Sequence, residues 1–260
     1  MTAMPLPSFD LTGRVALVTG ASSGFGAHWS KLLAAAGARV VITARRTDRL
    51  EALQAEIVAA GGAAHAVALD VADEAAVIAA YDEAERHFGT VDTIIANAGT
   101  ASDNNSINIP ADEFDAIIGT NLRGVFLTVR EGAKRLIAAG SAETGRGRVV
   151  IVSSITAKKI YPGTAAYSAS KAAVAHMSRV LAREWARKGI NVNSILPGYF
   201  ETEMTGNLFK APAGEQLVNS FPRRRLSLKS DMDVPLLFFA SDLSAQVTGS
   251  ELVVDDGQSL

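Results

Sequence analysis

The segment VALVTGASSGFG, residues 15–26, joins a short apolar run to a loop that contains three glycines. Val15–Val18 is apolar at every position, which is typical of a strand buried on both faces of a parallel sheet. A strand, a glycine-rich turn and a helix N-terminus form an anion site, because backbone N–H groups and the positive end of the helix dipole face the anion. Gly20 suits the tight turn, while Gly24 and Gly26 suit close approach of a pyrophosphate and of the helix to the strand. For this loop alone, a turn without a ligand is the alternative.

Six more short apolar runs follow along the chain, and helical patterns separate them. Repeated alternation of strand and helix predicts a doubly wound α/β fold of Rossmann type: a seven-stranded parallel sheet with helices on both faces. Asp73 is the expected N-cap of one helix. The further strands are expected at 39–43, 66–69, 93–96, 149–152, 192–195 and 251–254, and helices at 48–60, 75–88, 114–139 and 165–188.

Composition narrows the class of protein. Of the 260 residues 20% are charged and 48% apolar, with a formal net charge of -2, which excludes a disordered chain and argues against nucleic-acid binding. Cysteine is absent, so there is no disulfide, thiolate metal site or cysteine nucleophile, and the scattered histidines lack ligand spacing, so we expect no metal. No apolar stretch is long enough to cross a bilayer, and the start of the chain lacks a signal-peptide pattern. We therefore expect a cytoplasmic protein that does not bind membranes.

Domain organisation is expected to be simple. No change in composition marks a linker, so residues 1–260 are predicted to form one domain. Residues 199–229 interrupt the strand–helix alternation and are predicted to form an insertion over the edge of the sheet.

Tyr167 and Lys171 lie four residues apart on a predicted helix, so their side chains share one face. An ammonium group beside a phenol favours the phenolate and lowers the pKa of the tyrosine, which fits it for proton exchange near neutral pH. Ser154 follows the predicted fifth strand at its carboxyl end, where doubly wound proteins bind ligands, and its hydroxyl can donate to a carbonyl oxygen. An ordinary amphipathic helix surface is the alternative for the Tyr–Lys pair alone.

Several motifs occur in a characteristic order. TGASSGFG starts at Thr19, NAG spans 97–99, NLRGVF starts at Asn121, VSS ends at Ser154, YSASK spans 167–171 and PG occupies 197–198. This order resembles the short-chain dehydrogenase/reductase family, in its single-domain branch with the TGxxxGxG and YxxxK motifs. The resemblance extends from Gly13 to Gly257.

The resemblance implies a role for each matching residue. Tyr167 would be the general acid in reduction and the base in oxidation, and Ser154 would hold the substrate oxygen. Lys171 would lower the pKa of Tyr167 and bind the nicotinamide ribose, and Asn121 would position a water in a proton relay. The cofactor would contact Gly20, Ser22, Ser23, Gly24, Phe25, Gly26, Arg45, Arg46, Asp70, Val71, Asn97, Gly99, Tyr167, Lys171, Pro197, Gly198, Phe200 and Thr202.

The end of the predicted second strand indicates which nicotinamide cofactor is used. Relatives that prefer NAD usually carry an aspartate where this chain has Ala44, so a charge that repels a 2′-phosphate is missing there. Arg45 can bind that phosphate through paired hydrogen bonds, and Arg46 can add to the positive field. Ser23 is opposing evidence, because many NADP-preferring relatives have a basic residue there. The sequence predicts NADP(H), with NAD(H) as the alternative.

The predicted substrate is a ketone or secondary alcohol with a hydrophobic substituent, because the candidate pocket residues are mostly apolar or aromatic. Residues 199–229 would form a mobile lid that orders when substrate binds. A 3-oxoacyl thioester reductase and a non-catalytic dinucleotide-binding scaffold are the alternatives. The candidate substrate residues are Ser154, Ile155, Tyr161, Tyr167, Tyr199, Met204, Leu208 and Phe209.

Three features remain open from the sequence. Asp256 stands where relatives commonly have glycine, which leaves the local shape near the active-site edge undetermined. The run Arg223–Arg225 is either a solvated loop surface or an attractor for an anion. By resemblance the protein is expected to be a homotetramer that packs the long helices 114–139 and 165–188 against a partner.

Overall fold

The computed structural model describes residues 7–102, 104–201, 203, 205, 209 and 211–260. Seven parallel strands form one sheet in the order β3-β2-β1-β4-β5-β6-β7, which confirms the predicted fold class. The order reverses between β1 and β4, so the carboxyl ends of these two neighbours open a crevice for a ligand. The strands are β1 (Val15–Thr19), β2 (Arg39–Ala44), β3 (Ala63–Ala68), β4 (Thr93–Ala96), β5 (Gly147–Val152), β6 (Ile190–Pro197) and β7 (Glu251–Val254).

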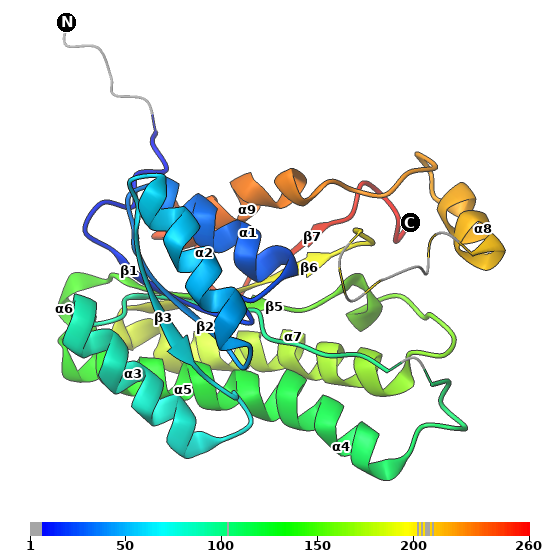
Figure 1. Cartoon of the computed structure of the whole chain (residues 1–260), viewed down its shortest axis with the longest axis horizontal. Helices are drawn as coiled ribbons and strands as arrows, with labels where there is room; N and C mark the ends of the chain where they lie inside the picture. Colours follow the sequence, from blue (N-terminus) through cyan, green and yellow to red (C-terminus); the bar gives the residue numbers. More distant parts are fainter. Residues whose placement is uncertain (1–6, 103, 202, 204, 206–208, 210) are drawn as a thin grey trace, which may run out of the picture.

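Helices cover both faces of the sheet (Figure 1). One core contains Trp29, Leu50 and Phe239, which pack α1 (Gly24–Ala35), α2 (Thr47–Ala59) and α9 (Asp233–Ala240) on the sheet. The other core lies under α3 (Glu74–Phe88), α5 (Val125–Ala138) and α7 (Ala165–Trp185). Successive residues of the central strands alternate between the two cores, which explains why runs such as Val15–Val18 and Val149–Val152 are apolar at every position. The remaining α-helices of the described chain are α4 (Ala111–Ile118), α6 (Ser141–Thr144) and α8 (Pro212–Ser220).

Local signals in the sequence correspond to local structure. Asp73 caps α3, where its carboxylate accepts from the backbone N–H groups of Ala75 and Ala76 at 2.9 and 3.2 Å. The helix expected at 114–139 differs from the prediction, because it begins at Ala111 and is interrupted by a π-helical turn, Gly119–Gly124. Gly124 lets this turn pack closely on the loop after β3, since a Cβ there would be 2.6 Å from Val71 Cγ2. Such turns occur often at functional sites.

The stretch between β6 and α9 leaves the sheet and returns to it. Phe200 and Ser227 form an isolated parallel bridge where the excursion begins and ends, and α8 lies within it at one end of the molecule (Figure 1). Gln258 holds both ends, because its Oε1 accepts from Tyr199 N at 2.6 Å and its Nε2 donates to Ser227 Oγ at 3.3 Å.

Asp256 accounts for the arginine run in this excursion. Its carboxylate pairs with Arg223 Nε at 2.9 Å and Arg225 Nε at 2.8 Å. The acidic residue that replaces the family's usual glycine therefore links the segment before Ser227 to the C-terminal turn. Asp256 has φ of 52°, the left-handed region that glycine adopts most readily, which fits the glycine common at this position in relatives. Arg223 and Arg225 remain largely exposed while paired.

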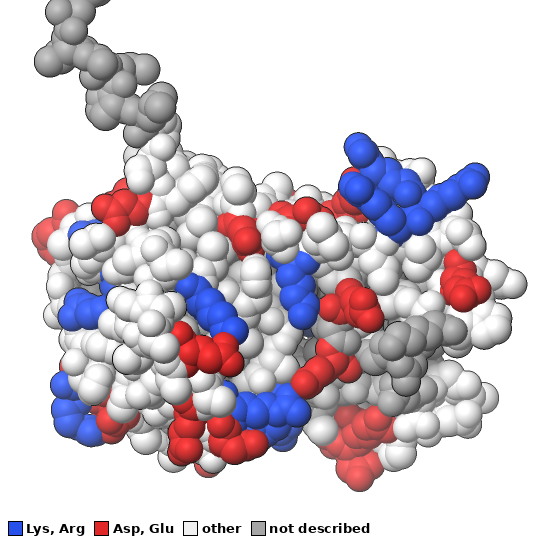
Figure 2. All heavy atoms as spheres, turned by 45° about the horizontal axis from the view of Figure 1, so that its top comes forward, with Lys and Arg blue, Asp and Glu red and all other residues white. Residues whose placement is uncertain are grey.

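Among the described residues, no helix combines the length and the apolar content that crossing a membrane requires. Within the same part of the chain, no group of three or more histidine or acidic side chains is arranged to hold a metal ion. The face shown in Figure 2 carries acidic and basic side chains interspersed.

Candidate active site and cofactor cleft

The glycine loop connects β1 to α1 in the form that an anion requires. Gly20 has φ of +69°, and Gly26 lies so close to it that a Cβ there would be 2.3 Å from the Gly20 carbonyl oxygen. Ser23 precedes α1, and its hydroxyl accepts from Arg46 instead of capping the helix. The first turn of α1, all of which the structure describes, carries no acidic side chain. Unblocked N–H groups and the helix dipole therefore fit the pyrophosphate of a dinucleotide.

A cleft of about 410 Å³ opens at the carboxyl ends of the strands, beside this loop. It brings together nearly all of the described residues predicted to bind the cofactor; Gly26 is the exception, and it serves the packing of α1 on β1. The predicted residues that line the cleft are Gly20, Ser22, Ser23, Gly24, Phe25, Arg45, Arg46, Asp70, Val71, Asn97, Gly99, Ser154, Tyr167, Lys171, Pro197, Gly198 and Phe200. The prediction omitted Ala44, Leu69, Ala98, Thr100, Thr120, Val152, Ser153, Glu203 and Thr205.

Asn97 links the glycine loop to the loop after β4. Its Nδ2 donates to the Thr19 carbonyl at 2.9 Å, and its backbone N–H donates to Thr19 Oγ1 at 3.1 Å. Gly99 follows in this loop, where a Cβ would lie 3.4 Å from both Asn121 Oδ1 and Lys171 Nζ. The absence of a side chain at Gly99 thus keeps the space in front of Lys171 open.

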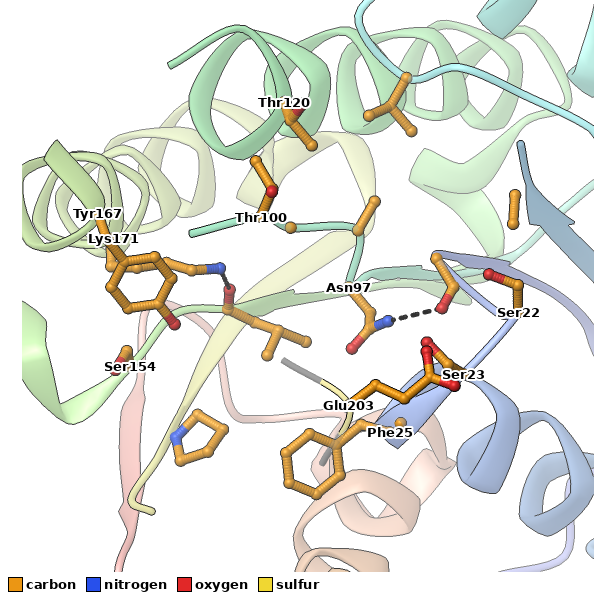
Figure 3. A pocket seen from close by; sticks show the side chains of 18 of the residues that line it. Ser22, Ser23, Phe25, Asn97, Thr100, Thr120, Ser154, Tyr167, Lys171 and Glu203 are labelled. Atoms are coloured by element: carbon orange, nitrogen blue, oxygen red, sulfur yellow. Dashed lines mark hydrogen bonds between the residues drawn. The ribbon is translucent and has the colours of Figure 1, made fainter. Parts of the chain in front are cut away.

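Tyr167 and Lys171 enter the cleft from α7, and Ser154 approaches from the end of β5 (Figure 3). Ser154 caps a short 3-10 turn, where its hydroxyl accepts from the Thr156 N–H at 3.2 Å. Lys171 Nζ donates to the Val152 carbonyl at 2.9 Å and lies 5.6 Å from the centre of the Tyr167 ring. The three side chains therefore come from two rigid elements that pack on each other.

Burial dominates the acidity of these groups. Desolvation lowers the pKa of Lys171 from its usual 10.5 to about 8. Desolvation raises the pKa of Tyr167, and a hydrogen bond with Ser154 opposes that rise. The lowering of the Tyr167 pKa that the sequence assigned to Lys171 stays a prediction, and Ser154 is a second group that opposes the rise caused by burial.

Asn121 lies in the π-helical turn and is fully buried. Its Oδ1 accepts from the Thr100 N–H at 2.8 Å, and its Nδ2 donates to the Thr100 carbonyl at 2.8 Å and to Ser170 Oγ at 3.0 Å. The side chain thus fastens the loop after β4 to α7. It does not line the cleft itself.

The two arginines after β2 differ in their contacts. Both line the cleft together with Ala44, but Arg46 is the one that reaches the glycine loop. Its Nη2 donates to Ser22 Oγ and to Ser23 Oγ, each at 2.9 Å. The sequence argument centred on Arg45, whereas the structure links Arg46 to the loop that faces the phosphates.

Aromatic side chains from the predicted substrate set lie against one another. Tyr199 meets Tyr161 and Phe209 edge-on, with ring centres 5.3 and 5.6 Å apart, and stacks on Phe221 at 5.6 Å. Burial raises the pKa of Tyr199, and nearby Tyr161 and Tyr167 add to the rise. Ile155 is buried in the 3-10 turn after Ser154. Thr202, Met204 and Leu208 lie outside the described residues.

Comparison with known proteins identifies the family. The profile described as short chain dehydrogenase matches residues 14–213. The chain belongs to the short-chain dehydrogenase/reductase family, and its fold and motif order are those of a single-sheet member. It is an NAD(P)-dependent oxidoreductase that acts on alcohol or ketone substrates.

Individual relatives differ in substrate at similar levels of identity. D-threitol dehydrogenase from Mycolicibacterium smegmatis is 35% identical over 97% of this chain and 95% of its own length. A 3-oxoacyl-[acyl-carrier-protein] reductase from Synechocystis is 34% identical over 95% and 97%. The structure of a gluconate 5-dehydrogenase from Burkholderia cenocepacia, in complex with NADP and tartrate, is 34% identical with a TM-score of 0.90 over 96% of both chains. Since similar identity spans three substrates, identity alone assigns none of them here.

Proposed function

We propose that the protein interconverts a ketone and a secondary alcohol that carries a hydrophobic substituent, with Tyr167 as the group that exchanges the proton. The observation that carries this proposal is the convergence of Ser154, Tyr167 and Lys171 on the cleft that the glycine loop also lines. A binding module needs no acid there, whereas a carbonyl reductase needs hydrogen-bond donors at the oxygen where negative charge develops.

In reduction, Ser154 donates to the substrate oxygen and Tyr167 transfers its proton to the same oxygen. When bound, the nicotinamide ring supplies the hydride to the carbonyl carbon, and in oxidation it accepts one. Lys171 is buried, and its ammonium donates to the Val152 carbonyl. In this position the ammonium can hydrogen-bond the nicotinamide ribose and stabilise the phenolate of Tyr167. The Asn121 side chain is held by Thr100 and Ser170, and we assign Asn121 to a water that links Lys171 to solvent in a proton relay.

The preferred cofactor is NADP(H). Ala44 presents no carboxylate at the end of β2, and the guanidinium of Arg46 bridges the glycine-loop serines at the position where a 2′-phosphate is expected. The NADP-bound gluconate 5-dehydrogenase shows that a relative with this fold binds that cofactor. Comparing kcat/KM for NADPH and NADH in wild type, Arg45→Ala and Arg46→Ala tests the preference. Wild type that prefers NADH, or a preference unchanged in both variants, contradicts it.

The hydrophobic substituent would lie on the aromatic group around Tyr199, beside Tyr167. Apolar pockets with a few placed polar groups favour alkyl or aryl ketones over polyols. The alternative is a 3-oxoacyl thioester reductase, which the similarity to the Synechocystis enzyme favours.

One panel separates these functions. Nicotinamide absorbance is followed with alkyl and aryl ketones, polyols and a 3-oxoacyl thioester, each with both cofactors. Highest kcat/KM for ketones with apolar groups supports the proposal, a preference for the thioester supports the alternative, and a preference for polyols contradicts the predicted pocket. No turnover by folded protein that binds cofactor would indicate a scaffold.

Other expectations concern the whole chain. Residues 1–260 are proposed to act as one domain in which 199–229 forms a lid. Stronger protease protection of 199–229 in the presence of cofactor and substrate is the expected result.

A homotetramer is proposed because Phe114, Phe126 and Val180 on α4, α5 and α7 are apolar and exposed. Light scattering that finds a stable monomer at micromolar concentration contradicts the tetramer. A cytoplasmic location stays a prediction from the sequence.

A further inference from the structure

Glu203 brings a carboxylate to the cofactor cleft from the excursion after β6. Its Oε2 lies 3.2 Å from Arg46 Nη1 and its Oε1 lies 2.5 Å from Arg49 Nη1. Figure 3 shows its carboxyl group beside Ser23, and both groups bind the same guanidinium of Arg46. The contact joins residues 157 positions apart and crosses the end of the cleft that Arg45 and Arg46 line, where the adenosine of the cofactor is expected.

The carboxylate uses donors that a phosphate would need. A guanidinium offers five N–H donors in a fixed plane, and carboxylates and phosphates bind to the same edge of that plane. Ser22 and Ser23 engage Nε and Nη2 of Arg46, while Glu203 engages Nη1. A ribose 2′-phosphate that binds this arginine therefore meets an anion already in place.

This arrangement changes the charge argument at the end of β2. Ala44 removes the carboxylate that opposes a 2′-phosphate in NAD-preferring relatives, but Glu203 returns a negative charge to the same region from a different element. Its charge is balanced by two arginines, so it is stable there before any phosphate arrives.

We propose that Glu203 is a cofactor-specificity residue whose carboxylate competes with the 2′-phosphate of NADP(H) for Arg46 and Arg49. The proposal rests on the NADP(H) preference proposed above. NAD(H) has no 2′-phosphate and leaves both ion pairs intact, so Glu203 moderates the preference for NADP(H) without affecting NAD(H).

The expected effect is moderate because the pairs are exposed. The two arginine side chains are 43% exposed and Glu203 is 55% exposed, so solvent screens both contacts. Two exposed ion pairs correspond to a change of about 2- to 10-fold in affinity. Salt weakens such contacts, so the effect is largest at low ionic strength.

The test measures binding, not turnover. The full chain is titrated with NADPH, NADH, adenosine 2′,5′-bisphosphate and 5′-AMP, as wild type, as Glu203→Gln and as the matched control Glu201→Gln, an exposed acid two residues earlier. Glu203→Gln is expected to lower Kd for NADPH and the bisphosphate about 2- to 10-fold, with NADH and 5′-AMP unchanged. The control should change none of the four. Equal changes for ligands with and without the 2′-phosphate, or no change, would overturn the proposal.

A further variant, Arg46→Ala, distinguishes failure of the Glu203 proposal from failure of the proposed NADP(H) preference. If it leaves adenosine 2′,5′-bisphosphate binding unchanged, Arg46 is not the phosphate site and the cofactor argument at Arg46 fails together with that for Glu203. If it weakens the bisphosphate while Glu203→Gln has no effect, the phosphate site stands and only the competition by Glu203 is wrong.

Discussion

Burying Lys171 destabilises the fold, and replacing it with methionine makes that cost measurable. The side chain is only 4% exposed, and burial lowers its pKa from 10.5 to about 8. With each pKa unit worth about 1.4 kcal/mol, the cost of holding this ammonium in the folded state is about 3 kcal/mol at pH 7. Methionine removes the charge at similar length and loses the ammonium hydrogen bond to the Val152 carbonyl, which is worth about 2 kcal/mol. The expected net gain for Lys171→Met is about 1 kcal/mol at pH 7.

The pH dependence of the stability difference shows whether the buried ammonium of Lys171 is its cause. Between pH 8 and 10.5 the unfolded lysine binds more protons than the buried one, so the cost is full below the folded pKa of about 8 and disappears as pH rises toward 10.5. The stability of the variant relative to wild type should therefore fall by about 2 kcal/mol from pH 7 to 9.5. Lys188→Met, at an exposed lysine just beyond the same helix, should show no such change.

Urea unfolding of wild type and both variants at the two pH values measures this directly. A Lys171→Met variant less stable than wild type at pH 7, or a stability difference independent of pH, would refute the account of Lys171 as a charge held in the cleft at the expense of stability. The same variant should lose turnover, because stability and activity conflict at such sites.

Two further predictions concern the loop and the C-terminal turn. Gly26→Ala places a Cβ 2.3 Å from the Gly20 carbonyl oxygen, so the glycine loop must move; we expect Kd for both nicotinamide cofactors to rise at least about 10-fold, and unchanged affinity would show that the loop tolerates the displacement. Asp256→Asn weakens the pairs to Arg223 and Arg225, so proteolysis of 199–229 should speed up while thermal stability changes by no more than about 1 kcal/mol; a cleavage rate equal to wild type would show that Gln258 suffices to hold the segment.

The fold was predictable from the sequence because the buried sheet imposes a simple pattern. Strands covered on both faces contain runs of consecutive apolar residues, and the glycine loop marks the first of them. The convergence of Ser154, Tyr167 and Lys171 on one cleft could be predicted because their spacing and motif order leave little freedom. The π-helical turn around Asn121 could not, since its shifted hydrogen bonds depend on the loop after β4 and not on apolar periodicity.

Contacts of polar residues in irregular segments also could not be predicted from the sequence. Glu203 meets Arg46 across 157 positions, and nothing in its local sequence marks that partner. The Val152 carbonyl that holds Lys171 is a backbone group, which no residue type reveals. The sequence marked Asp256 as a difference from relatives, but its role became clear only from its ion pairs with Arg223 and Arg225 in the structure.

Proton transfer by Tyr167 is the central claim, and Tyr167→Phe tests it most directly. The substitution removes the hydroxyl and keeps the aromatic ring. Single-turnover reduction of the best ketone from the panel, with cofactor affinity measured on the same sample, isolates the chemical step. We predict a rate lower by about 10²- to 10⁴-fold with cofactor Kd largely unchanged. A rate near that of wild type would contradict the assignment of Tyr167 as the acid.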